Sequence, residues 1–145
     1  MANASRFQYR DHKIPKLSIT IPENFHPDEM QTIAYFANYS VNYGNGAWLG
    51  TVALGFRQKV SQEDDAPVLF EIVCIGNFLF QSEKSDQSRA EFIDFLRKSG
   101  AATLIPIERA AMLSASAIAG YPNACVIPNI NVYSLQWIEI DNGNG

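Results

Sequence analysis

The chain of 145 residues is long enough for one domain that folds around a hydrophobic core without disulfides or metal ions. Its content of 47% apolar and 18% charged residues excludes a disordered or a fibrous protein. The net charge of -4 argues against nucleic acid as a partner, because phosphate binding draws on a clustered excess of lysine and arginine. We therefore expect a single domain over residues 1–145.

The N-terminal part of the chain predicts an arm followed by a short strand. Its basic residues are few and dispersed, which indicates a solvated, flexible arm over residues 1–13. Alternating apolar residues from Lys16 to Ile21 predict the strand. Pro22 and Pro27 then interrupt the pattern and predict an irregular crossing.

Three further strands are predicted as a meander. Apolar and polar residues alternate from Ala34 to Tyr43 and again from Ala47 to Val60. Between them, Gly44-Asn45-Gly46 favours the positive φ angles of a tight hairpin. The third strand, Val68 to Phe80, is apolar on both faces, so we expect another element to cover its second face. The residues on that second face are Leu69, Val73, Ile75 and Leu79.

Two helices are predicted next. Ser88 and Glu91 form the pattern of a capping box, which starts a first helix that ends at Gly100. A second helix begins at Thr103 and ends at Gly120. Alanine and serine surround most of the second helix and leave it without a polar face, which is typical of an enclosed helix.

Neither end of the chain predicts a targeting or membrane segment. The N-terminus lacks the apolar core of a secretion signal, and no run approaches the roughly 18 apolar residues of a membrane span. Residues 132–140 have no clear period, and residues 141–145 form a polar tail. Cys74 and Cys125 lie among hydrophobic residues, as free buried thiols do. We expect a protein of the cytoplasm that does not insert into membranes.

The chain lacks the motifs of a catalytic or metal site. His12 and His26 have no cysteine or carboxylate at a metal-binding spacing. Cys74, Ser114 or Ser116 could act as a nucleophile if the fold placed a histidine beside it, which sequence distance does not exclude. We expect a binding protein that is not an enzyme and that uses no metal and no cofactor.

Short motifs in the second half of the chain keep a recognisable order and spacing. They are Leu69-Phe70-Glu71-Ile72 with Gly76-x-Phe78, Leu104-Ile105-Pro106 with Arg109, Tyr121-Pro122, and Ile127-Pro128-x-Ile130-Asn131. In this order they resemble SecB, the bacterial protein-export chaperone. The resemblance covers roughly residues 14–137, and the tail of residues 141–145 is shorter than is usual in the family. The chain is identified as a divergent member of a SecB-like chaperone family.

The resemblance implies a fold and an assembly. The fold would be α+β, with a four-stranded antiparallel sheet and helices on one face. The assembly would be a homotetramer built as a dimer of dimers, with the long helices packed between the sheets. This arrangement would account for the small residues of the second helix. The residues implied at the oligomer interface are Ala111, Ser114, Ala115 and Ile118.

The resemblance also implies a function. Family members are ATP-independent holdases that bind unfolded or precursor polypeptides in apolar grooves and pass them to the export motor SecA. Glu71 matches the family's acidic position that contacts the motor. The residues implied in the polypeptide-binding groove are Phe36, Trp48, Phe78, Phe80, Tyr133 and Trp137.

Two alternative functions remain open at this point. The short tail favours a dedicated chaperone of one client, such as the antitoxin that some SecB-like proteins serve. A small-molecule-binding or hydrolytic domain could use the same apolar cleft, and it would require a buried ionisable pair that the sequence does not indicate.

Overall fold

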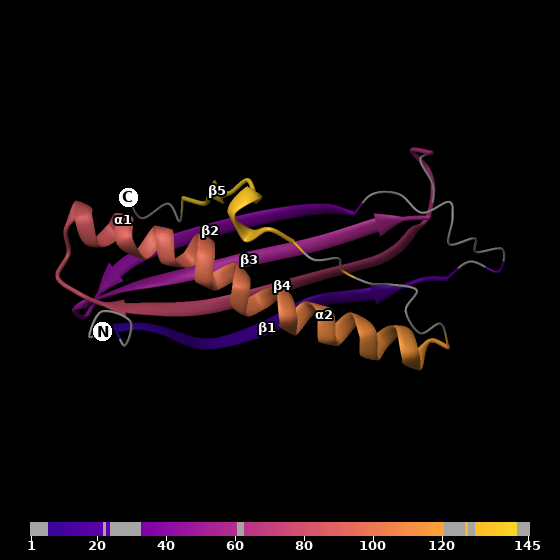
Figure 1. Cartoon of the computed structure of the whole chain (residues 1–145), viewed down its shortest axis with the longest axis horizontal. Helices are drawn as coiled ribbons and strands as arrows, with labels where there is room; N and C mark the ends of the chain where they lie inside the picture. Colours follow the sequence, from indigo (N-terminus) through magenta and orange to yellow (C-terminus); the bar gives the residue numbers. More distant parts are fainter. Residues whose placement is uncertain are drawn as a thin grey trace.

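A computed structural model describes residues 6–21, 23, 33–60, 63–120, 127 and 130–141. The fold is α+β, as predicted, and consists of one mixed sheet and one long helix (Figure 1). The strands follow the order β1-β4-β3-β2-β5 across the sheet. Their bounds are β1 (Phe7–Ile19), β2 (Ala34–Gly44), β3 (Ala47–Lys59), β4 (Val68–Gln81) and β5 (Ile138–Glu139).

The sheet differs from the predicted four-stranded antiparallel sheet by one additional strand. β1 to β4 are antiparallel to their neighbours, as predicted. β5 pairs with β2 in parallel, at Asn38 and Tyr39. A strand of two residues has no alternation for a sequence pattern to detect, and its pairing depends on where the preceding chain delivers it.

β1 also begins earlier than predicted, because residues 7–13 form a strand and not a flexible arm. Phe7 stacks on Phe80 with ring centroids 4.2 Å apart, and on Phe95 with centroids 4.6 Å apart. Register shifts between Tyr9 and Lys16 interrupt the alternation of side chains along this strand. The alternation of apolar residues therefore indicated only the second half of β1 as a strand.

The hairpin of β2 and β3 confirms both predicted strands and the turn between them. Asn45 and Gly46 have φ angles of 55° and 79°, the left-handed values for which Asn-Gly is suited. β4 pairs with β3 along its length and confirms the meander. Trp48 of β3 lies opposite Phe80 of β4, and the even-numbered side chains of both strands face the helix.

One continuous helix replaces the two predicted helices. It consists of α1 (Asp86–Phe95), a π-helical segment η3 (Leu96–Gly100) and α2 (Ala101–Ile118). The capping box lies three residues earlier than predicted, since the Ser85 side chain accepts from the Ser88 N–H, and the Ser85 N–H donates to the Ser88 hydroxyl.

Gly100 does not end a helix, because its role is close packing. A Cβ atom at Gly100 would lie 3.1 Å from Cγ2 of Val52 on β3, so glycine allows the helix to approach the sheet. Thr103 does not cap a new helix either. Its hydroxyl donates to the carbonyl of Ser99, one turn earlier in the same helix, at 2.8 Å.

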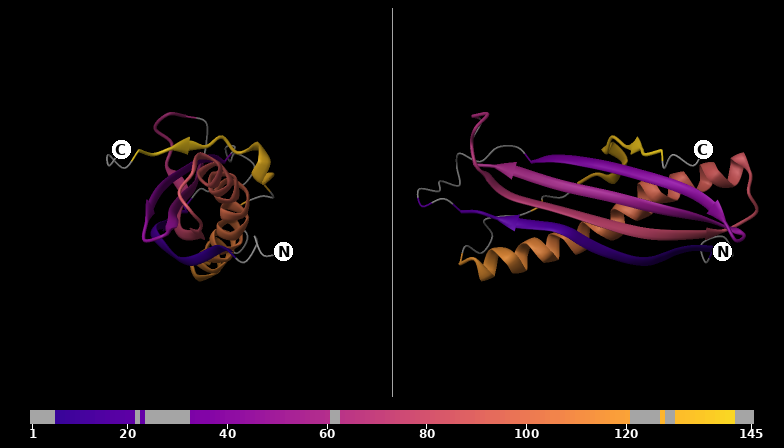
Figure 2. Two further views of the ribbon diagram at one scale, coloured as in Figure 1. Left: turned by 90° about the vertical axis from the view of Figure 1, so that its left-hand side faces the viewer. Right: turned by 180° about the vertical axis from the view of Figure 1, so that it is seen from behind.

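The helix crosses one face of the sheet diagonally, from the β2 side near the hairpin to beyond β1 (Figure 1). Between helix and sheet lies the core, to which the helix contributes Phe92, Leu96, Leu104, Ile105 and Met112. In the part of the chain that the structure describes, no element covers the opposite face of the sheet (Figure 2). Even so, Leu69 is fully buried and Leu79 is 8% exposed on this second face of β4, whereas Val73 and Ile75 are only partly buried. The predicted burial of this face is therefore found at the two ends of β4.

By length and hydropathy alone, the segment Asp86–Ile118 would be sufficient to cross a membrane. Charged residues such as Lys98 and Glu108 interrupt this segment, so it contains no uninterrupted run of about 18 apolar residues. Its inner row of side chains packs on the sheet, which is also the arrangement of a core helix.

Several predictions fall outside the described residues, and the structure leaves them as predictions. They concern residues 1–5, Pro22 and Pro27, His26, Tyr121-Pro122, Cys125 and residues 142–145.

Candidate functional site

The six aromatic residues predicted to line a groove are not brought together. Trp48, Phe78 and Phe80 are at most 5% exposed, because they lie on the sheet face that the helix covers. The indole N–H of Trp48 donates a 2.8 Å hydrogen bond to the hydroxyl of Ser88 at the start of α1. These three side chains form the core between sheet and helix, which corrects their predicted place in an accessible groove.

The other three aromatic residues are accessible from two different sides. Phe36 is 39% exposed on the sheet face that points away from the helix. Tyr133 is 74% exposed in a short turn, η4 (Val132–Ser134). Trp137 is partly buried and meets the ring of Tyr39 edge-on, with centroids 6.2 Å apart. Tyr133 and Trp137 thus share the C-terminal segment that lies beside β2.

One carboxylate attaches this C-terminal segment to the rest of the molecule. Glu139 of β5 accepts a 2.6 Å bond from the Arg89 guanidinium on α1 and a 3.1 Å bond from the Tyr39 hydroxyl on β2. Burial and the neighbouring Glu139 raise the pKa of Tyr39, which keeps its hydroxyl a donor. Arg89 and Tyr39 lie 50 and 100 residues from Glu139, so no local sequence pattern could indicate this cluster.

Two hollows flank the attachment along the edge of β2. The larger has a volume of about 780 Å³ and lies between Val41–Tyr43 of β2, the start of α1 and the end of the C-terminal segment. The smaller, of about 280 Å³, is lined by Tyr35 at the other end of β2 and by Ser134 and Leu135. The β2 edge therefore carries a hollow on either side of β5.

A third hollow, of about 230 Å³, lies at one end of the sheet, where Phe36, Arg57 and Glu71 meet. The ring of Phe36 lies over Gly55 of the adjacent strand. The Glu71 carboxylate is predicted to contact an export motor. It forms an ion pair with Lys16 of β1, in which Oε1 of Glu71 lies 2.7 Å from Nζ of Lys16. It is therefore partly neutralised where it lies.

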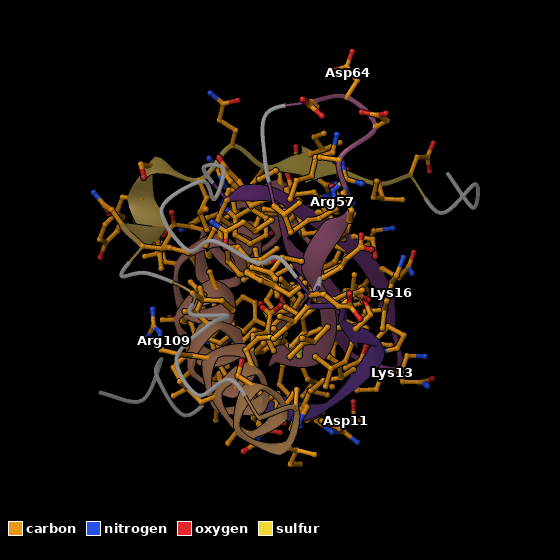
Figure 3. All side chains as sticks on the ribbon, turned by 90° about the vertical axis from the view of Figure 1, so that its right-hand side faces the viewer. Asp11, Lys13, Lys16, Arg57, Asp64 and Arg109 are labelled. Carbon is orange, nitrogen blue, oxygen red and sulfur yellow. The ribbon has the colours of Figure 1, made fainter. Side chains whose placement is uncertain are left out.

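The charges of β1 also point away from the helix. Lys13 and Lys16 project from β1 on the side of the molecule opposite Arg109 of α2 (Figure 3). Asp11 on the same strand accepts a 2.6 Å bond from the Asn77 side chain. This face is thus mixed in charge rather than acidic.

The residues implied at an oligomer interface lie on an accessible side of α2. Ser114 and Ile118 are exposed, and Ile118 is 87% exposed. Ala111 and Ala115 are partly buried beside them. The interface between copies stays a prediction, and the exposed Ile118 is the kind of apolar side chain that such an interface covers.

The inner side of α2 carries a polar group inside the core. Glu108 is fully buried, and neither of its carboxylate oxygens has a hydrogen-bond partner in the described part of the chain. Burial raises the pKa of Glu108 to about 9, so the side chain is a neutral carboxylic acid at pH 7. Burial, with a contribution from Glu108, also raises the pKa of Cys74 to about 12.

The candidate nucleophiles are not activated by the groups that surround them. Cys74 is buried, and its raised pKa keeps it a thiol rather than a reactive thiolate. The Ser116 hydroxyl is buried without a hydrogen-bond partner, and Ser114 is exposed. His12 contacts the hydroxyl of Tyr9 on β1. The described residues thus contain no pairing of a histidine with Cys74 or Ser116.

This sheet, with its long helix on one face, is similar to a solved structure of known class. That structure is a SecB-like chaperone of Mycobacterium tuberculosis in complex with a ChAD peptide from the HigA1 antitoxin. The TM-score is 0.54 at 14% identity, and the match covers 90% of this chain and 95% of that chain. No protein-family model and no curated protein matches the chain. The fold is therefore SecB-like, and the likeness is one of structure.

Proposed function

We propose that this chain is an ATP-independent chaperone that binds unfolded polypeptide. The observation that carries the proposal is the apolar surface beside the β2 edge, on a SecB-like fold. Its exposed residues are Tyr35 at 41%, Tyr133 at 74%, Ile138 at 61% and Ile140 at 44%. Burial of such surface by the apolar side chains of a client contributes roughly 25 cal/mol per Å² and requires no specific sequence.

The test is suppression of aggregation by the purified chain. Without nucleotide, it is expected to slow the aggregation of reduced α-lactalbumin at micromolar concentration. Tyr133→Ser is expected to weaken this effect, while Leu49→Ser, which changes a 46% exposed residue on the bare sheet face, preserves it. A wild-type chain without any effect on aggregation would contradict the proposal.

A dedicated client is the second candidate. The structurally similar chaperone was solved with a peptide from an antitoxin, which supports a client of that kind for this chain as well. Purification of the chain from its native cells separates the two. One stoichiometric client favours a dedicated chaperone, whereas a spread of precursor proteins favours a role in export from the cytoplasm.

A role in export would also require that the chain transfers its bound client to a SecA-type motor. The motor would contact Glu71, which Lys16 holds at 2.7 Å, so a cation of the motor has to replace Lys16. We therefore expect weak binding to SecA, measurable by titration, and stronger binding after Lys16→Ala. Equal binding by the wild type and by Glu71→Gln would exclude this contact.

A further inference from the structure

The β2 edge is partly open, and backbone groups define what it can bind. β5 pairs with β2 at Asn38 and Tyr39 alone, although β2 runs from Ala34 to Gly44. The Tyr39 carbonyl points to this edge, because it accepts a 2.7 Å bond from the Ile140 N–H. Residues two apart along a strand point their backbone groups to the same side. Val41 and Tyr43 therefore direct their N–H and C=O groups to the same edge.

No described residue pairs with these groups of Val41 and Tyr43. The hollow of about 780 Å³ lies directly beside them, with the start of α1 as its opposite wall. A strand edge whose backbone donors and acceptors have no partner among the described residues is a template for another extended chain. The occupant that fits this edge is thus a polypeptide in strand conformation.

The segment that covers the middle of the edge is held weakly at its end. We call residues 136–141 the strap. Leu135, just before it, is 6% exposed and is fixed in the core. Beyond Leu135, the strap is held by the Gln136 N–H on the Tyr35 hydroxyl at 2.9 Å, by the two-residue β5 and by Glu139. The Arg89–Glu139 pair is 38% and 41% exposed, so solvent screens it strongly.

We infer that a client segment adds to the edge of β2 as a strand and displaces the strap, with Leu135 as the fixed point. This inference deepens the proposed chaperone function and depends on it. Displacement of the strap exposes the ring of Tyr39 from beneath Trp137 and extends the open edge past Val41 toward Tyr35.

The pleat of β2 also defines the side-chain pattern of the client. On the helix side, β2 presents Tyr39, Val41 and Tyr43, all of them partly buried apolar or aromatic residues. On the other side it presents Ser40 and Asn42. Because an added strand continues both faces of the sheet, the favoured client segment alternates apolar with polar residues.

Backbone methylation tests the inference on the unmodified chain. The probe is a ten-residue peptide in which leucine alternates with threonine, with a lysine at each end. Two further forms carry N-methyl groups either on the leucines or on the threonines. Since a strand directs alternate N–H groups to its neighbour, one methylated form is expected to lose at least tenfold in affinity and the other to bind like the parent. Equal loss by both forms, or loss by neither, overturns strand addition.

Substitutions test the edge and the strap separately. Val41→Pro removes an outward N–H from an edge strand and is expected to weaken peptide binding at least tenfold, with circular dichroism to check the fold. Leu17→Ala, on the opposite edge strand β1, is expected to leave the affinity unchanged. Glu139→Gln loosens the strap and is expected to strengthen binding several-fold. Unchanged affinity in both Val41→Pro and Glu139→Gln overturns the inference.

A second probe separates this inference from the proposed function. Reduced, alkylated α-lactalbumin is a permanently unfolded protein. If the wild-type chain binds it but the two methylated peptides behave alike, strand addition is wrong and the chaperone function stands. If the chain binds neither the unfolded protein nor the parent peptide, both proposals are wrong.

Discussion

Gly50 of β3 lies directly beneath Leu96 in the π-helical segment of the helix. A Cβ atom at Gly50 would stand 2.7 Å from Cδ1 of Leu96 and 2.7 Å from Cζ of Phe92. Both of these side chains are fully buried, so neither can move aside without disturbing the core. The close approach of helix and sheet at this point thus depends on the absence of a side chain.

Gly50→Ala is therefore expected to destabilise the fold by about 1–3 kcal/mol, the usual cost of overpacking a core. Urea denaturation followed by circular dichroism measures the change. Gly44→Ala is the matched control in the same hairpin, because a Cβ atom at Gly44 meets nothing within 4 Å. An equal loss of stability in both variants would show that the effect comes from the backbone rather than from contact with the helix.

The hydroxyl of Ser88 joins the start of the helix to β3. It accepts from the Trp48 indole at 2.8 Å and donates to the Glu83 carbonyl at 2.7 Å. Ser88→Ala leaves the buried indole N–H without a partner and removes part of the capping box. We expect a loss of about 1–3 kcal/mol in urea denaturation. Ser82→Ala removes an exposed hydroxyl and is expected to change stability by less than about 0.5 kcal/mol.

Local patterns predicted the hairpin, since Asn45-Gly46 specifies the turn and the alternation on both sides specifies the strands. They did not predict which face of the sheet is covered. Alternation groups Trp48 with Phe56 and separates them from Leu49, but it does not say which group lies beneath a helix. The resemblance to SecB implied Trp48, Phe78 and Phe80 in a groove, and the alternation contained nothing that would have placed them beneath the helix instead.

The attachment of β5 could not be predicted for a different reason. Arg89, Tyr39 and Glu139 come from three elements, and their meeting depends on the complete fold. The helix starts three residues before its predicted start, because its capping box is formed by Ser85 and Ser88 and contains no glutamate. In the same way, glycine is the residue type that commonly ends a helix. Gly100 instead allows close packing against Val52, and the helix continues past it.

The accessible side of α2 provides a test of the predicted assembly. Ala115→Trp places a large side chain between Ser114 and Ile118 and is expected to reduce the oligomeric state without unfolding the chain. Light scattering coupled to gel filtration measures the mass. Ala102→Trp is the matched control, because this alanine is also exposed but lies at the start of α2, about three turns of helix before Ser114. An unchanged mass for Ala115→Trp would contradict an interface at these residues.

Glu108 gives the fold a specific dependence on pH. Burial raises its pKa from 4.5 to about 9. Below pH 4.5 the carboxyl is protonated in both the folded and the unfolded chain, so it does not make the free energy of unfolding depend on pH. Between pH 4.5 and about 9, the unfolded chain releases the proton while the folded chain retains it. The free energy of unfolding therefore falls as pH rises, by up to about 1.4 kcal/mol per pH unit, and the fall ends above pH 9.

Glu108→Met removes this titration and fills the same space with an apolar side chain. At pH 7 we expect the variant to be more stable than the wild type by about 3 kcal/mol, from the pKa difference alone. Urea denaturation between pH 5 and pH 9 is expected to show a smaller slope with pH for the variant. Glu91→Gln, an exposed glutamate of α1, is expected to keep the wild-type slope. If Glu108→Met retains the wild-type slope as well, the buried carboxyl is not the group that controls it.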